Sequence, residues 1–196
     1  MKVLLYGSTG NAGSRILQEL KARGHQVTVL SRQQDDLSNV DTIASHIAGA
    51  DAVVSAYAPP QDNTDALVAV TKNLIAAVKK NGKVRLIVVG GAASLEVAPG
   101  VTLLQSGHLP PEWLAIAASH GRALELLQAS DINWTCFSPA AFFEPGERTG
   151  KFRLGTNTLI ADEKGNSRIS MEDYAIALVD ELENPKYERA RFTIGY

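Results

Sequence analysis

Short apolar runs alternate along the chain with longer segments in which apolar residues recur every three or four positions. The run from Val3 to Tyr6 predicts a buried strand, and the following segment carries Ile16, Leu17 and Leu20 at helical spacing. The same patterns predict strands at residues 25–30, 52–56, 84–89, 132–137 and 191–196, and helices within residues 35–48, 62–80, 111–130 and from 170 onward. This alternation is typical of a doubly wound α/β fold with a mostly parallel sheet and three layers.

Two stretches depart from this alternation. A doubly wound fold normally has a third strand before the helix within residues 35–48, but residues 33–39 are too polar and too short to form a good one. We therefore expect the third strand to be short or missing. Residues 96–112 lack any period and contain three prolines and two glycines, which predicts a long loop on the substrate side of the molecule, at about residues 95–112.

The turn after the first strand is the main candidate for ligand binding. It consists of Gly7, Ser8, Thr9, Gly10, Asn11, Ala12 and Gly13. A strand before it and a helix after it are the context of a phosphate-binding turn, in which a dinucleotide pyrophosphate lies on the helix N-terminus. We expect Gly7 to let the chain leave the strand sharply, Gly10 to let the backbone approach phosphate, and Gly13 to let helix and strand pack closely.

The end of the second predicted strand bears on the choice of cofactor. Ser31 and Arg32 follow that strand, and an arginine at this position accommodates the 2′-phosphate of NADP(H). We therefore expect NADP(H) to be preferred over NAD(H). Asp35 and Asp36 lie about 20 residues beyond the glycine turn, where the ribose-binding acid of NAD enzymes is expected, so NAD remains an alternative.

The carboxyl ends of the later strands supply further candidates, because ligands bind at this edge of an open α/β sheet. The segments that leave those strands contain Ala56, Tyr57, Ala58, Gly90, Gly91, Ser138, Pro139 and Ala140. Gly90 and Gly91 are equally consistent with a plain turn and with a wall beside the nicotinamide. Arg148, Lys151 and Arg153 add positive charge beyond Ala140.

Composition and charge exclude several classes of protein. The chain has 196 residues, which suits one domain, and a formal net charge of −2, which supplies no basic field for nucleic acid. Its single cysteine, Cys136, cannot form an internal disulfide, and no stretch approaches the length of a membrane span, so we expect a cytoplasmic protein without membrane contact. The spacing of the four histidines predicts no metal site.

Several motifs resemble those of the atypical short-chain dehydrogenase/reductase family, and the match spans essentially the whole chain. They lie at residues 7–13, 32, 49–54, 90–95, 133–140, 143–150 and 169–175. The branch that the chain resembles most is that of the NAD(P)H-binding proteins often called NADH-flavin reductase-like, which is similar to biliverdin reductase B. The resemblance implies a Rossmann-type core with the cofactor along the carboxyl edge of the sheet, and it implies that Asp36 and Leu37 lie beside the adenine.

The chain departs from the parent superfamily at the catalytic positions. Where that superfamily has a tyrosine and a lysine four residues on, this sequence has Ile116 and His120. Ile116 cannot exchange a proton, so interconversion of alcohols and ketones by that pair is not expected. His120, which matches a histidine of biliverdin reductase B, and Ser94, which lies near the superfamily's serine, are the remaining catalytic candidates. An ordinary hydrogen-bonding role is the alternative for each of them.

These observations favour an NADPH-dependent reductase of a flat conjugated acceptor, such as free flavin, a quinone or a tetrapyrrole. Tyr57, Trp113, Phe142 and Phe143 are candidates to line the acceptor site. Free flavin is expected as a substrate and not as a bound group, because no second domain is present to hold it. The alternative is a sensor that binds NAD(P) without turnover, as in relatives that resemble the fungal nitrogen-repression regulator. Either protein is expected to act as a monomer or homodimer.

Overall fold

The computed structural model describes residues 1–30 and 36–196. In this part of the chain the main sheet has seven strands: β2 (Gln26–Val29), β1 (Lys2–Tyr6), β3 (Ala52–Ser55), β4 (Arg85–Val89), β7 (Trp134–Ser138), β11 (Ala190–Gly195) and β9 (Arg153–Gly155), in that spatial order. The first six strands are parallel, and β9 pairs antiparallel with β11. The predicted doubly wound, mostly parallel sheet is therefore confirmed.

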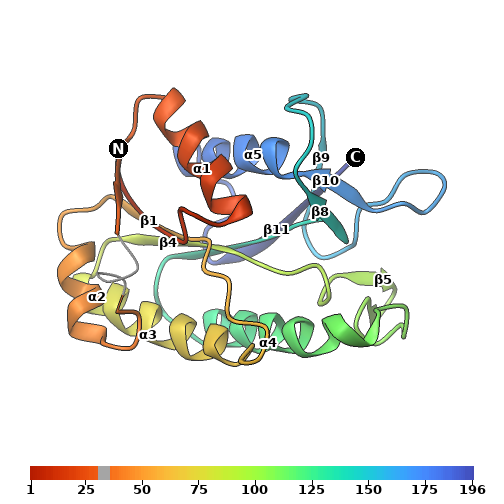
Figure 1. The fold of residues 1–196 in the computed structure, drawn as a ribbon, viewed down its shortest axis with the longest axis horizontal. Coiled ribbons are helices and arrows are strands. Elements are labelled where there is room, and N and C mark those ends of the chain that lie inside the picture. Colours follow the sequence, from red (N-terminus) through yellow and green to blue (C-terminus); the bar gives the residue numbers. More distant parts are fainter. Residues whose placement is uncertain (31–35) are drawn as a thin grey trace.

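Helices cover both faces of this sheet and complete the three predicted layers (Figure 1). One face carries α1 (Asn11–Ala22) and α5 (Met171–Glu183), which pack against each other. The other face carries α2 (Val40–Ile47), α3 (Ala66–Asn81) and α4 (Pro111–Gln128), which form a continuous row. The chain thus forms a single α/β domain of the Rossmann type.

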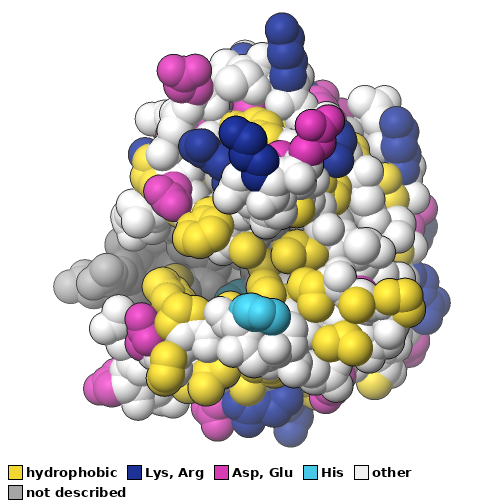
Figure 2. All heavy atoms as spheres, turned by 90° about the vertical axis from the view of Figure 1, so that its right-hand side faces the viewer, with side chains coloured by type: hydrophobic (Ala, Val, Ile, Leu, Met, Phe, Trp, Pro, Cys, Tyr) yellow, Lys and Arg dark blue, Asp and Glu magenta, His cyan; other side chains and the backbone are white. Residues whose placement is uncertain are grey.

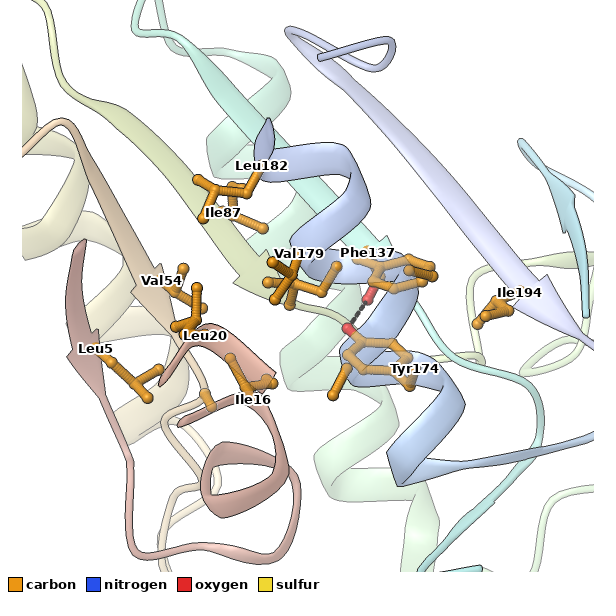
Figure 3. Close-up of a cluster of buried hydrophobic side chains, with 14 of the residues drawn as sticks. Leu5, Ile16, Leu20, Val54, Ile87, Phe137, Tyr174, Val179, Leu182 and Ile194 are labelled. Atoms are coloured by element: carbon orange, nitrogen blue, oxygen red, sulfur yellow. Dashed lines mark hydrogen bonds between the residues drawn. The ribbon is translucent and has the colours of Figure 1, made fainter. Parts of the chain in front are cut away.

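The core lies in two layers because the side chains of each central strand alternate between the two faces of the sheet. In β1, Val3 and Leu5 belong to the cluster under α1 and α5, whereas Leu4 and Tyr6 belong to the cluster under the other helices. Figure 3 shows the first of these clusters, in which the Tyr174 hydroxyl donates a hydrogen bond of 2.7 Å to the Phe137 carbonyl. Burial on both faces explains why the strands are apolar throughout.

The described residues between β2 and α2 contain no strand, in agreement with a third strand that is short or missing. In the described sheet β2 is consequently an edge strand beside β1. Residues 31–35 lie outside the described part of the chain.

Residues 96–112 do not form the single long loop that their lack of period predicts. They include an antiparallel hairpin of β5 (Glu96–Ala98) and β6 (Val101–Thr102), with buried Leu95 and Leu103 on either side. The hairpin is bound to the segment after β9, since the Glu96 amide donates to the Asn157 carbonyl at 2.8 Å. Strands of two and three residues are too short to produce a recognisable alternation, which is why the sequence pattern missed them.

The last strand of the chain is also not the last strand of the sheet. The strand predicted at residues 191–196 forms as β11, but β9 pairs outside it, with Leu154 opposite Ile194. A separate two-stranded parallel ribbon, β8 (Phe142–Glu144) and β10 (Arg168–Ser170), lies near this edge. None of the helices in the described residues combines the length and the apolar character that crossing a bilayer requires.

Candidate functional site

The turn between β1 and α1 depends on two of its glycines for purely steric reasons. Gly7 has a φ of 75°, and a Cβ atom there would lie 2.3 Å from the Ala56 carbonyl oxygen. A Cβ atom on Gly13 would lie 2.0 Å from the Gly7 carbonyl oxygen, so α1 could not pack so closely against the turn. Gly10 differs, because a Cβ atom there would lie 3.4 Å from its nearest neighbour, the Gly7 carbonyl oxygen.

The N-terminus of α1 is suited to an anion. The helix starts at Asn11, no side chain caps it, and its first turn contains no acidic residue. The first amides of a helix lack intrahelical acceptors, and the helix dipole adds positive potential there. Thr9, Gly10 and Asn11 are exposed, so a pyrophosphate could reach these amides. The geometry therefore fits the pyrophosphate of a dinucleotide.

The neighbouring strands end at the same edge of the sheet as β1. Tyr6 pairs with Ser55 of β3, Ser55 with Val88 of β4, and Val89 with Phe137 of β7. The first crossover leads from β1 to β2 on one side of β1, and the second leads to β3 on its other side. The gap between β1 and β3 is therefore a topological switch point, where such folds bind ligands. The predicted residues Ala56, Tyr57, Ala58, Gly90, Gly91, Ser138, Pro139 and Ala140 follow or end these strands. The structure thus brings them to one edge.

Gly90 and Gly91 serve close packing within the protein. A Cβ atom on Gly90 would lie 2.7 Å from the Cys136 Sγ atom, and one on Gly91 would lie 2.9 Å from the His120 ring. Both glycines therefore allow the end of β4 to approach β7 and α4. The Cys136 side chain is buried, and burial raises the pKa of its thiol to about 12.

His120 is a residue of α4, and its ring packs against Gly91 at the end of β4. Burial lowers the pKa of His120 to about 4, since a charged imidazolium would lose its hydration there. The imidazole is consequently neutral at pH 7. It can donate one hydrogen bond and accept another, but it holds no acidic proton for general acid catalysis at that pH.

Ser94 contacts a residue that the sequence pattern did not single out. The Arg191 guanidinium in β11 donates to the Ser94 hydroxyl at 2.8 Å and to the Ser94 carbonyl at 3.1 Å, and it also donates to Asn157. Burial lowers the pKa of Arg191 from its usual value. Arg191 lies 97 positions from Ser94 in the chain, so only the fold brings the two together. The catalytic role of Ser94 remains a prediction.

The adenosine end of the site is described only in part. Ser31 and Arg32, with Asp35, lie outside the described residues. The Asp36 carboxylate accepts hydrogen bonds from the amide and hydroxyl of Ser38, which hold the pKa of that carboxyl below its usual value. The Leu37 side chain is buried in the core, and its carbonyl oxygen accepts a hydrogen bond of 2.9 Å from the Asn73 side chain, so its contact with an adenine stays a prediction.

The remaining aromatic candidates differ in their exposure. Tyr57 is half-buried, and burial raises the pKa of its phenol, so this side chain is a neutral one at the end of β3. Phe143 packs against Tyr174 in the core, with ring centroids 4.7 Å apart. The helical spacing of residues 111–130 predicts burial of Trp113 and Leu114, but both are exposed because they lie in the first turn of α4, beyond the edge of the sheet.

The positive charge expected after Ala140 is neutralised at Arg148. Arg148 forms an ion pair with Glu19 of α1 at 2.9 Å and is thereby held against that helix. The Asp173 carboxylate accepts hydrogen bonds from the Thr149 hydroxyl and the Gly150 amide. These contacts fasten residues 145–150 beside α1. Among the described residues, no cluster of His, Cys, Asp and Glu could hold a metal ion.

A close glycine turn, an uncapped helix and a parallel sheet with a switch point define a dinucleotide-binding protein of the Rossmann type. Residues 7–185 match the model of the NAD(P)H-binding family, and the chain belongs to that family.

Solved structures of similar proteins cover the same length. A candidate exported protein from Burkholderia pseudomallei is 47% identical, with a TM-score of 0.94 and full coverage of both chains. A candidate epimerase from Bacteroides thetaiotaomicron is 42% identical, with a TM-score of 0.91 over 100% of this chain and 96% of that one. A candidate NADH-flavin reductase from Streptococcus pneumoniae is 31% identical, with a TM-score of 0.90 over 100% and 99% of the two chains.

Proposed function

We propose that the protein is an oxidoreductase that uses NADPH in preference to NADH and transfers hydride to a flat conjugated acceptor, such as free flavin, a quinone or a tetrapyrrole. The observation that carries the proposal is the cradle of Gly7, Gly10 and Gly13 at the uncapped start of α1. The likeness to a candidate NADH-flavin reductase supports the choice of acceptor.

In this proposal the protein acts mainly by placing two planar rings face to face. The bound cofactor supplies the hydride, and the segments at the ends of β3, β4 and β7 hold its nicotinamide end. Correct placement alone lowers the barrier substantially, because the reacting atoms meet at near-attack distance. His120 stays neutral and orients a ring or a water molecule by hydrogen bonding, while water supplies the proton.

The proposed preference for NADPH rests on Arg32. A guanidinium fits phosphate oxygens with its fork of donors, whereas a nearby carboxylate would repel a 2′-phosphate. Asp36 accepts two hydrogen bonds from Ser38, which supports the requirement that its carboxylate is directed away from such a phosphate.

A second function is a cofactor sensor that binds NAD(P) without turnover. The observation that favours it is the pair of Ile116 and His120 at the superfamily's catalytic positions, since neither offers an acidic proton at pH 7. Either function is proposed for a cytoplasmic monomer or homodimer.

Steady-state oxidation of NADPH by purified protein separates the two functions. We expect acceptor-dependent oxidation with at least one member of a panel of FMN, riboflavin, quinones and biliverdin. Tight binding of NADPH without oxidation by any member of the panel would overturn the reductase and favour the sensor. Gly13→Leu serves as the matched control, because it should abolish both binding and turnover.

A further inference from the structure

The exposed large hydrophobic side chains of the described residues are concentrated around one edge of the molecule. There are eight of them, and six lie in the hairpin, the start of α4, β8 and β9: Val97, Val101, Trp113, Leu114, Phe142 and Leu154. We call these six residues the apolar rim. Trp113 is 57% exposed and Phe142 is 63% exposed, values that are unusual for such large apolar side chains. Of the other two, Met1 directly precedes β1 and Val29 is the last residue of β2.

The apolar rim borders the edge of the sheet where the cofactor is proposed to bind. The hairpin follows β4, α4 begins after the hairpin, and β8 follows β7, so all three lie beyond the carboxyl ends of parallel strands. Figure 2 shows hydrophobic side chains gathered along both sides of a hollow on this side of the molecule. An apolar patch around a hollow is typical of a ligand site.

Two cations of the described residues, one in β11 and one after β8, are held by contacts within the protein itself. Arg191 donates to Ser94 and Asn157, and Arg148 pairs with Glu19. A phosphate or carboxylate on the acceptor would therefore compete with these existing partners for its own counter-charge.

The Arg153 guanidinium also has hydrogen-bond partners within the protein: it donates to the Ala161 carbonyl at 2.7 Å and to the Tyr196 carbonyl. Lys151 and Arg168 line a groove of about 640 Å³ along the β8–β10 ribbon, which Phe142 of the apolar rim also lines. Glu144 and Glu147 line the same groove, so its four charges cancel.

We propose that the acceptor is an uncharged quinone that carries an alkyl chain, with its ring beside the nicotinamide and its chain along the apolar rim. This inference rests on the proposed reductase function and selects one of its acceptor classes. The quinone takes one hydride from NAD(P)H and one proton from water, and it leaves as the quinol, with NAD(P)⁺ as the other product. FMN and biliverdin carry anionic groups, for which the described residues along the apolar rim and the neighbouring groove supply no net positive charge.

The test compares 2,3-dimethoxy-5-methyl-1,4-benzoquinone with its 6-decyl derivative, because the two share one redox ring and differ in the chain. Each buried methylene contributes about fourfold in affinity, so two or three of them on the apolar rim should raise kcat/KM by about 15- to 60-fold. FMN and riboflavin serve as further arms. FMN should be the poorer substrate of the two, because it shares the ring of riboflavin and adds a phosphate at the end of the ribityl chain.

Leu114→Ser and Val97→Ser should reduce the ratio of kcat/KM between the two quinones toward one. Val29→Ser is the matched control, because Val29 is as exposed as Leu114, at 42%, but lies in the edge strand β2. It should leave the ratio unchanged. Trp113 provides a second readout without cofactor, since the decyl quinone should quench its fluorescence in the wild type more strongly than in Leu114→Ser.

Three results would overturn the inference. Equal kcat/KM for the two quinones, or a preference for FMN, would refute the alkyl quinone while leaving the reductase intact. Self-association that Leu114→Ser abolishes, with no effect of the chain, would assign the apolar rim to a second copy of the protein. No turnover with any acceptor would refute the proposed function itself.

Discussion

His120 combines a position at the end of β4 with an environment that excludes charge. We predict that its pKa is about 4 in the folded protein. Between that value and the unfolded value of about 6.5 the unfolded chain binds more protons, so His120 makes the free energy of unfolding fall as the pH falls through this window. NMR titration of the imidazole, assigned with His120→Gln, measures the pKa, and a value above 6 would contradict the prediction.

The same environment limits what His120 contributes to catalysis. Because it holds no acidic proton at pH 7, His120→Ala should lower the rate of acceptor reduction by about tenfold or less, below the usual range for general acid catalysis. A loss of about a thousandfold in kcat at pH 7 would make His120 an obligate acid.

Arg32 determines cofactor choice in the proposed function. Charged hydrogen bonds contribute about 1.5–3 kcal/mol, so Arg32→Ala should weaken NADPH binding by about one to two powers of ten and leave NADH nearly unchanged. Calorimetric dissociation constants for both cofactors at fixed ionic strength test this. Equal weakening of both cofactors would show that Arg32 does not contact the 2′-phosphate.

The sequence predicts where the candidate residues lie in the fold better than it predicts which residues they contact. The glycine spacing predicts a sharp turn at Gly7 and close packing at Gly13, and the φ of 75° at Gly7 and the 2.0 Å separation of a Gly13 Cβ atom from the Gly7 carbonyl oxygen agree with it. The contact between Arg191 and Ser94 has no local signature, since it joins a strand, β11, to the turn between β4 and β5, 97 positions earlier in the chain.

Among the contacts between secondary-structure elements, the packing of α1 against the glycine turn is highly sensitive to an added side chain. Gly13→Ala places a Cβ atom 2.0 Å from a carbonyl oxygen, so α1 must shift away from the turn. We predict a loss of about 1–3 kcal/mol in the free energy of unfolding, together with weaker binding of both cofactors.

Gly10→Ala is the control for the Gly13 substitution, because its Cβ atom would lie 3.4 Å from the nearest atom within the protein. It should leave stability nearly unchanged and affect the cofactor alone. Urea unfolding and calorimetry measure the two effects, and equal destabilisation by both substitutions would contradict this account.

Length decides which elements the sequence predicts. The helices carry a clear period and the buried strands of the main sheet are apolar runs of four or more residues, so the existence of both follows from the pattern of apolar positions. The hairpin of β5 and β6 and the edge strand β9 have two or three residues each and show no period. They form because neighbouring backbone supplies hydrogen-bond partners, which is a property of the assembled fold.

At the scale of the whole molecule, a buried ion pair joins the sheet to α5. The Arg85 guanidinium donates to the Glu181 carboxylate and, at 2.9 Å, to the Glu181 carbonyl. The same carboxylate accepts hydrogen bonds from the amides of Lys186 and Tyr187. Both charged side chains are almost fully buried, so each depends on the other for compensation.

Glu181→Gln should therefore destabilise the protein by about 3–5 kcal/mol, because it leaves the Arg85 charge buried without a counter-charge. Asp131→Asn is the control: it breaks the exposed ion pair with Lys79 and should cost less than about 1 kcal/mol. Urea denaturation compares the two. A similar loss for both would mean that burial adds nothing to the Arg85–Glu181 pair.

The burial of Cys136 has a practical consequence. Thiol reagents attack the thiolate, and a thiol with a pKa of about 12 inside the sheet offers almost none of it at pH 7. Because the chain has one cysteine, the folded wild-type protein should be inert toward maleimides. A cysteine introduced at a chosen surface position would then be the single reactive one, so fluorophores or spin labels could be attached site-specifically without first removing a native residue.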